Sequence, residues 1–171
     1  ENVGYARANN QVLRNITSPT LAPARGGEKG EVASPQSRYI LLLNPDVEIA
    51  SDSFDKMISF MDNDSSVGIA GCKVVKSDGS FDKASMRNFP DLKNSLLHFF
   101  GFASTYNPDL PQDEVAVVDS VMGAFLMISC EAIDQIGLLD EAFFMYGEDL
   151  DWCMRAKQAG FRVMYAPVTT V

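Results

Sequence analysis

Apolar residues are arranged along this chain in two ways, as short continuous runs and as one stripe with helical spacing. The run at residues 38–43 is apolar after its first residue, which is typical of a strand buried on both faces of a parallel sheet. A second segment begins with Ser51-Asp52-Ser53, residue types that commonly cap a helix. It continues with apolar residues at i, i+3, i+4 and i+7, namely Phe54, Met57, Ile58 and Met61. We therefore predict a buried strand followed by an amphipathic helix.

The rest of the chain repeats this alternation of strand and helix. Residues 1–15 are expected to form a loop that enters a helix, because their alanines and Leu13 favour helix. Further strands are predicted at 67–75, 115–118, 123–129 and 161–166, with a turn at 77–80 and helices at 131–136 and 149–159. Strands that alternate with helices indicate an α/β sandwich with a mostly parallel sheet.

Two segments lack this periodicity. Residues 16–37 are rich in Pro, Gly, Ser and Ala, and we predict a flexible insertion there. Residues 91–114 mix aromatic, Pro and polar residues, and we expect a loop with short helical pieces over a cleft. The chain has 171 residues, 46% of them hydrophobic, which suits one compact domain with a core of its own.

The composition excludes several classes of partner. A net charge of −9 argues against nucleic acid or an anionic membrane as the main partner, because both require a basic face. No apolar run approaches the roughly 18 residues that a membrane-spanning helix needs. Three cysteines without C-x-x-C spacing fit reduced thiols in a cytoplasmic setting better than disulfides or a zinc site.

The two ends of the chain suggest a piece of a longer polypeptide. The sequence begins at Glu1 without a methionine, and it stops at Val171 directly after a predicted strand. We expect both ends to be cut.

The first candidate site follows the strand at residues 38–43. Asn44-Pro45-Asp46 lies at the carboxyl end of that strand, where ligands gather in open α/β sheets. Pro45 stiffens the turn, so that Asp46 is held in a fixed direction. A carboxylate presented in this way could bind Mg²⁺ or Mn²⁺, which prefer oxygen ligands and often bridge to phosphates. The alternative is that Asn44 and Asp46 only make turn hydrogen bonds.

The second candidate site is acidic as well. Glu148, Asp149 and Asp151 follow an aromatic run and Gly147, at the start of a predicted helix. One carboxylate could simply favour the helix N-terminus. Three exceed that need, and a base at the mouth of a half-apolar pocket would have its pKa raised toward a working value. Asp151 could orient that base, although its i, i+4 spacing favours a salt bridge with Arg155.

Several motifs together resemble the family 2 glycosyltransferases, most closely their bacterial rhamnosyltransferase-like branch. The matching segments occur in the family's order and leave out only about residues 16–37 and 91–114. They are residues 2–6 with Asn9-Asn10, 41–46, 78–79, 87–90, 121–126, 137–141 and 143–151. This resemblance implies a Rossmann-like three-layer α/β/α sandwich of the nucleotide-diphospho-sugar transferase type, called GT-A.

The resemblance also implies roles for individual residues. Asn44-Pro45-Asp46 stands where the family has its D-x-D motif, so Asp46 would be the metal contact and Asn44 would contact ribose or metal-bound water. Glu148-Asp149 matches the family's E-D motif, with Asp149 as the general base of an inverting transfer. The implied acceptor-side residues are Gly123, Ala124, Phe125 and Asp151, and the implied nucleotide-side residues are Asn2, Gly4 and Asn9.

By the same resemblance, the substrates would be a nucleotide-sugar donor and a saccharide or lipid-linked acceptor, used in the cytoplasm at the inner face of the membrane. Apolar positions around Phe99, Phe100 and Phe102 could form a lid, a peripheral membrane contact or an interface with another subunit. The family's N-terminal nucleotide-binding strand and helix and its C-terminal His have no counterpart here, so we expect weak or absent turnover from the 171 residues alone. The alternatives are a non-catalytic nucleotide- or carbohydrate-binding module of the same fold and, with less support, a metal-dependent phosphohydrolase.

Overall fold

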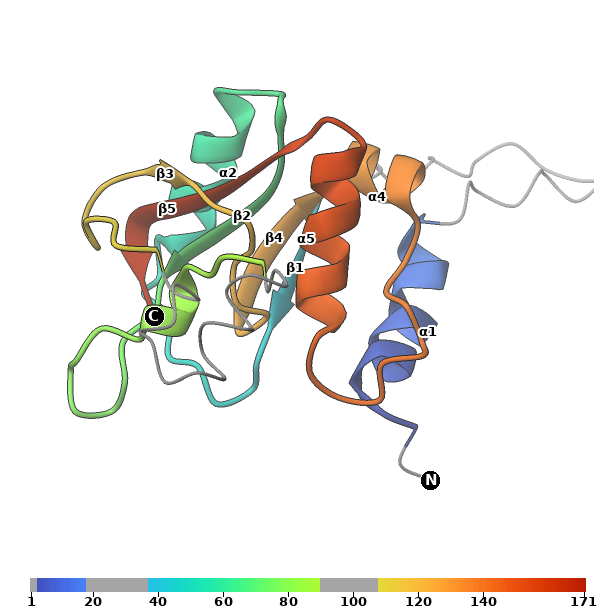
Figure 1. Ribbon diagram of the computed structural model, residues 1–171, viewed down its shortest axis with the longest axis horizontal. Helices are drawn as coiled ribbons and strands as arrows, with labels where there is room; N and C mark the ends of the chain where they lie inside the picture. Colours follow the sequence, from blue (N-terminus) through green and yellow to red (C-terminus); the bar gives the residue numbers. More distant parts are fainter. Residues whose placement is uncertain (1–2, 18–36, 90–107) are drawn as a thin grey trace, which may run out of the picture.

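The computed structural model describes residues 3–17, 37–89 and 108–171, which form one sheet with helices on both faces (Figure 1). The elements are α1 (Tyr5–Thr17), β1 (Tyr39–Leu43), α2 (Ser53–Asp62), β2 (Val67–Lys73), the 3₁₀ turn η1 (Lys83–Ser85), β3 (Ala116–Val117), β4 (Phe125–Ser129), α4 (Cys130–Ile136), α5 (Glu148–Gln158) and β5 (Arg162–Thr170).

The sheet separates two apolar cores, and this makes the three layers of the sandwich. In β4, Phe125 and Met127 pack with α2 on one face, and Leu126 and Ile128 pack on the other face, which α1, α4 and α5 cover. The alternation follows from the two-residue repeat of a strand. The α/β class and the three layers that the sequence predicted are confirmed.

The prediction of a mostly parallel sheet is wrong. The strand order is β1-β4-β2-β5-β3, and three of its four pairings are antiparallel, since only β2 and β5 run parallel. β4 lies between β1 and β2 and runs opposite to both. Because helices cover both faces of the sheet, every central strand has a continuous apolar sequence, whether it pairs in parallel or antiparallel. The apolar run therefore could not predict the direction of the strands.

Some element boundaries also differ from the prediction. α1 continues through Thr17, so residues 16 and 17 are helical, whereas residues 18–36 lie outside the described part. Asp52 is the N-cap residue of α2, but its side chain pairs with Lys56 instead of capping the helix. Of the predicted loop at 91–114, only residues 108–114 are described. The Gln112 carbonyl accepts a hydrogen bond from the Tyr165 hydroxyl of β5, and the Asp113 carboxylate accepts one from Lys73 of β2.

In the described residues, no helix combines the length and the apolar character that crossing a bilayer requires.

Candidate functional site

The end of β1 lies against the segment that precedes β4. The backbone N–H of Asn44 donates to the carbonyl of Ala124 at 3.0 Å, and Val47 N–H closes a turn on the carbonyl of Asn44 at 3.3 Å. Asp46 is exposed in this turn. The structure therefore brings two of the predicted segments, 44–46 and 123–124, to one place.

The start of α5 is fixed by an unusual backbone. Gly147 is the N-cap residue and has a left-handed φ of 96°, and Tyr146 before it has a φ of 68°. A positive φ is disfavoured for a residue with a side chain and is found most often where function or packing requires it. Because Gly147 is the N-cap residue, none of the three acids of the first turn is the N-cap itself.

Asp149 is buried and held from three directions. Its Oδ2 accepts a hydrogen bond from the backbone N–H of Gly123 at 3.0 Å and from Nη2 of Arg87 at 2.6 Å. Its Oδ1 accepts from the N–H of Leu150 at 2.8 Å. Gly123 adjoins Ala124, so the carboxylate is tied through two backbone contacts to the end of β1.

Glu148 is also buried, but its carboxylate is less well satisfied. Its side-chain Oε2 has no hydrogen-bond partner in the described structure. Burial, followed by the neighbouring charge of Asp149, raises the pKa of Glu148, and Arg87 offsets part of this effect. A carboxyl group with a raised pKa and a free acceptor oxygen is a better proton acceptor than a solvated glutamate.

The N-terminal helix reaches the same place. Tyr5 N–H donates to the carbonyl of Phe144 at 2.9 Å, and Gly4 has a φ of 83° there. A Cβ on Gly4 would lie 2.6 Å from the Phe144 oxygen, so only glycine permits this approach. Burial raises the pKa of the Tyr5 hydroxyl, and the charges of Glu148 and Asp149 raise it further, which indicates that the ring lies near the acidic pair.

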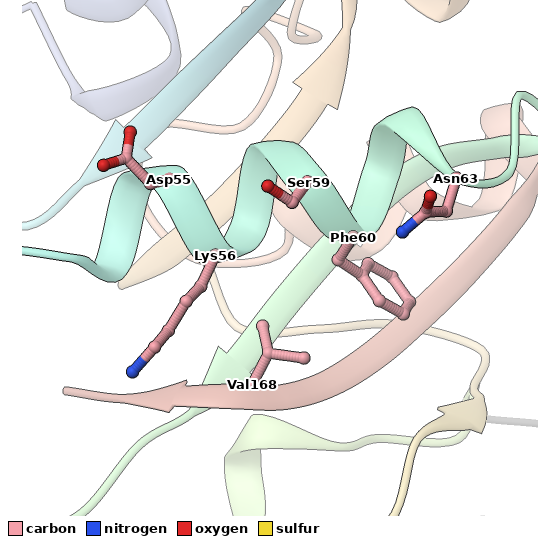
Figure 2. Close-up of a pocket in the computed structure, with 6 residues that line it drawn as sticks. All are labelled: Asp55, Lys56, Ser59, Phe60, Asn63 and Val168. Atoms are coloured by element: carbon pink, nitrogen blue, oxygen red, sulfur yellow. The ribbon is translucent and has the colours of Figure 1, made fainter.

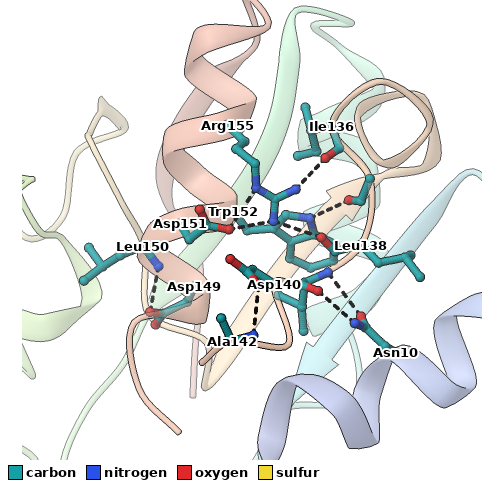
Figure 3. A network of polar contacts seen from close by, with 12 residues as sticks. Asn10, Ile136, Leu138, Asp140, Ala142, Asp149, Leu150, Asp151, Trp152 and Arg155 are labelled. Carbon is teal, nitrogen blue, oxygen red and sulfur yellow. Dashed lines mark hydrogen bonds and ion pairs between the residues drawn. The ribbon is translucent and has the colours of Figure 1, made fainter. Parts of the chain in front are cut away.

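The remaining predicted residues lie in different surroundings. Asn9 donates back to the carbonyl of Tyr5 within α1, and its side chain also hydrogen-bonds the side chain of Tyr5. Asn2 is outside the described residues. Phe125 points into the α2-side core, away from the acidic pair. Asp151 forms the salt bridge with Arg155 that its spacing predicted, at 2.7 Å. Arg155 also donates to the carbonyls of the connection between α4 and α5, as Figure 3 shows.

Two residues of this region were assigned no role from the sequence. Arg87 was noted only as part of a motif, yet it forms the buried ion pair with Asp149. Asn10 is buried, and its amide both donates to the carbonyl of Leu139 and accepts from its N–H, which holds α1 against the connection that precedes α5 (Figure 3). A polar residue on the core face of α1, between the buried Ala6 and Leu13, was the available signal for Asn10.

A pocket of about 410 Å³ lies elsewhere, between α2 and β5 (Figure 2). It is lined by Asp55, Lys56, Ser59, Phe60, Asn63 and Val168. None of these residues belongs to the predicted site, and α2 covers the sheet face opposite α5.

Comparison with known proteins identifies the family of this chain. Residues 9–171 match the family described as "Glycosyltransferase like family 2". The chain is 30% identical to the rhamnosyltransferase WbbL of Escherichia coli K12 over 130 residues, which are 75% of this chain and 49% of WbbL. It is 25% identical to the N-acetylglucosaminyl-diphospho-decaprenol L-rhamnosyltransferase of Mycobacterium tuberculosis over 179 residues, 99% of this chain and 55% of the relative.

The chain therefore spans about half the length of these curated relatives. Among solved structures, GalNAc-T7 with UDP, GalNAc and Mn²⁺ has a similar fold, with a TM-score of 0.50, 14% sequence identity, and coverage of 78% of this chain and 27% of that chain. Because the family match extends over residues 9–171, nearly the whole sequence, this chain belongs to glycosyltransferase family 2.

Proposed function

We propose that this chain carries the catalytic residues of an inverting glycosyltransferase, which moves a sugar from a nucleoside-diphosphate donor to an acceptor hydroxyl. The observation that carries the proposal is the hydrogen bond between Gly123 N–H and Oδ2 of Asp149, one residue from the contact between Ala124 and Asn44. An inverting transfer needs a base for the acceptor and a contact for the departing diphosphate in the same cleft. These two hydrogen bonds join the segments proposed for the two tasks.

Asp46 is the proposed contact for a divalent cation. Within the described ranges, no group of three or more His, Cys, Asp or Glu side chains could hold a metal ion without further ligands. Asp46 is, however, an exposed carboxylate beside Asn44, and Mg²⁺ is commonly held by one or two carboxylates together with substrate phosphates. The residues thus fit Mg²⁺ or Mn²⁺ that binds with the donor. When bound, the cation would neutralise charge on the leaving diphosphate.

The acidic pair at the start of α5 is proposed to accept the proton of the acceptor hydroxyl. Asp149 is the residue that the family resemblance names, and its fixed carboxylate supports this role. Glu148 would keep the site negative and poorly hydrated, since it is buried beside Asp149. General base catalysis of this kind typically contributes about 10²–10⁴-fold to the rate.

The relatives support a choice of substrates. Both are named rhamnosyltransferases, and the mycobacterial one carries a diphospho-decaprenol acceptor in its name. We therefore propose L-rhamnose or a related hexose as the transferred sugar and a saccharide or lipid-linked acceptor. Such a reaction would take place in the cytoplasm at the inner face of the membrane.

Calorimetric titration tests the donor site. The chain is titrated with uridine diphosphate and with deoxythymidine diphosphate, each with and without Mn²⁺. We expect binding that depends on Mn²⁺ and that Asp46→Ala removes. Asp55→Ala is the matched control, because Asp55 is an equally exposed aspartate on α2. Equal loss in both variants, or binding that ignores Mn²⁺, would contradict the proposed role of Asp46.

A second assay distinguishes an enzyme from a binding module. It measures the release of nucleoside diphosphate from deoxythymidine-diphospho-rhamnose or uridine-diphospho-glucose. A module of the same fold would bind the nucleotide but release no product in the presence of acceptors. Release that Asp149→Asn abolishes supports the enzyme.

A further inference from the structure

Arg87 is the buried cation beside the acidic pair, and its guanidinium has three acceptors. Its Nη2 donates to Oδ2 of Asp149 and to the carbonyl of Val121, both at 2.6 Å, and to Oγ of Ser120 at 3.1 Å. The side chain is nearly enclosed, since Arg87 is 9% exposed. Arginine presents its donors in a rigid plane, so three acceptors around Nη2 fix the direction of that edge of the guanidinium.

The backbone around Arg87 is held as firmly as its side chain. Arg87 and Ser120 exchange two backbone hydrogen bonds, at 2.9 and 3.0 Å, in an isolated antiparallel bridge. Two residues later, Phe89 N–H donates to Oδ2 of Asp119 at 3.0 Å. Val121 in turn packs so closely on Gly71 that a Cβ there would lie 2.6 Å from it. Arg87 is therefore anchored to a segment that cannot shift freely.

The contacts of Asp149 are unequal between its two oxygens. A carboxylate oxygen can accept two hydrogen bonds. Oδ2 already accepts two, from Arg87 and from Gly123. Oδ1 accepts one, from Leu150 N–H, so in the described structure it keeps one acceptor direction for a further donor.

We infer that Arg87 is the positioning residue of the proposed transferase site: together with Gly123 it occupies Oδ2 of Asp149, and it leaves Oδ1 as the oxygen that takes the acceptor proton. In this step the acceptor O–H bond breaks as the oxygen forms its bond to the anomeric carbon. The proton goes to Oδ1, and the bond between sugar and diphosphate breaks. This inference rests on the proposed function, and it adds a residue and an oxygen atom that the proposal leaves open.

Arg87 has a second effect that does not depend on turnover. The charged or titratable groups that act on Glu148 are Asp149, which raises its pKa, and Arg87, which lowers it, while Tyr5 approaches the pair from α1. Loss of the Arg87 cation should therefore raise the pKa of Glu148 further. This titration reports whether Arg87 stands beside the pair in solution.

The kinetic test compares the wild type with Arg87→Met and Arg87→Lys, by nucleoside diphosphate release from deoxythymidine-diphospho-rhamnose and from uridine-diphospho-glucose. Because misplacing a reacting group by about 1 Å can cost about 10²-fold, we expect Arg87→Met to lower kcat by about 10²-fold at a nearly constant donor KM. Lysine keeps the charge but not the planar fork, so Arg87→Lys should recover part of the rate. A loss of kcat that only follows the folded fraction, or an effect on KM alone, would overturn the inference.

The second test is a carboxyl ¹³C NMR titration of Glu148, which needs no donor or acceptor. We expect its pKa to rise in Arg87→Met and to fall in Asp149→Asn. Arg155→Met is the matched control, since Arg155 also pairs with an aspartate of α5 and with two carbonyls. It should destabilise the fold and leave the titration of Glu148 unchanged.

The outcomes separate the inference from the proposed function. If the wild type neither binds uridine or deoxythymidine diphosphate nor releases diphosphate from either donor, and the titration of Glu148 shifts as expected, the transferase proposal fails while the contact of Arg87 with the pair stands. If Arg87→Met does not fold, the test is made with Arg87→Lys. Lysine places its charge at a different position from the guanidinium, so the pKa of Glu148 should still change. An unchanged titration in a folded Arg87 variant overturns the inference, whatever the activity.

Discussion

Asp149 and Asp151 lie two residues apart on α5, and each pairs with an arginine, but the two pairs are built differently. Asp151 and Arg155 pair within one helix, at 2.7 Å, with side chains that are 24% and 26% exposed. Asp149 and Arg87 are 62 residues apart in the sequence and pair at 2.6 Å, with side chains that are only 12% and 11% exposed. The first pair joins α5 to the preceding connection, and the second pair joins α5 to the proposed cleft.

The difference indicates which pair can serve chemistry. Arg155 also donates to the carbonyls of Ile136 and Leu138, so its pair ties α5 to the end of α4 and to the connection that follows it. Arg87 and Gly123 hold one oxygen of Asp149 and leave the other with a free direction. Burial strengthens the hold of Arg87 on Asp149, because charges interact more strongly where water is excluded.

The largest expected difference is in turnover. Asp149→Asn should lower kcat for nucleoside diphosphate release by about 10²–10⁴-fold, because it removes the proposed base. Asp151→Asn should change kcat by less than about threefold, since it alters a pair outside the proposed chemistry. Steady-state kinetics at matched folded fractions measures both, and equal losses in the two variants would remove the distinction between the pairs.

The next effect concerns the loop that leads into α5, and it is measured as stability. Gly4→Ala places a Cβ 2.6 Å from the carbonyl oxygen of Phe144, at a φ of 83°. Gly79→Ala is the control, because Gly79 has a similar φ of 80° with no atom within 4 Å. We expect urea unfolding to give a loss of about 1 kcal/mol for Gly79→Ala, from strain alone, and about 2–4 kcal/mol for Gly4→Ala. Similar losses would mean that the contact between α1 and Phe144 does not fix the loop.

The same two regions show what the sequence could predict. The salt bridge between Asp151 and Arg155 was predicted from i, i+4 spacing, since helix geometry alone brings such residues together. The pair between Arg87 and Asp149 depends on how two distant segments pack, and no local pattern carries that information. The acidic pair itself was found from the cluster of carboxylates in the sequence, and the resemblance assigned its roles, whereas its geometry was not predicted.

The fold divides in the same way. The apolar runs located β1, β2 and β4 to within about two residues, because burial on both faces leaves a pattern in the sequence. The sheet was wrongly predicted to be mostly parallel, because strand direction depends on chain connection rather than on composition. The close approach of Gly4 to Phe144 depends on how two distant segments pack, and no local pattern predicted that contact.

A smaller effect is expected in the pH dependence of stability, with opposite signs in the two regions. Burial raises the pKa of Glu148 above its ordinary 4.5, so the unfolded state releases the proton first and stability falls as pH rises through that interval. Hydrogen bonding by the Asn10 amide and by Arg14 lowers the pKa of Glu141, so its contribution is present above 4.5 and is lost as pH falls.

Urea unfolding from about pH 3 to pH 7 measures both slopes. Compared with the wild type, Glu148→Gln should lose less stability as the pH rises, and Glu141→Gln should lose less as the pH falls. Each variant serves as the control for the other. If both substitutions change the pH dependence of the unfolding free energy with the same sign, Glu148 is hydrated in solution. Glu148 and Glu141 would then not differ in the way that the two regions do.

The smallest effect is expected at Ser120, which supports Arg87 without touching Asp149. Its buried Oγ accepts from Nη2 of Arg87 at 3.1 Å and donates to the carbonyl of Val121 at 3.2 Å. Ser120→Ala removes the longest of the three contacts of Nη2 and leaves the two at 2.6 Å. The loss of one neutral hydrogen bond should destabilise the fold by about 0.5–1.5 kcal/mol, with kcat changed by less than about threefold. A loss of kcat as large as that of Arg87→Met would mean that the Ser120 hydroxyl sets the direction of the guanidinium. The hydrogen bond to the Val121 carbonyl and the backbone bridge between Arg87 and Ser120 would then not be sufficient.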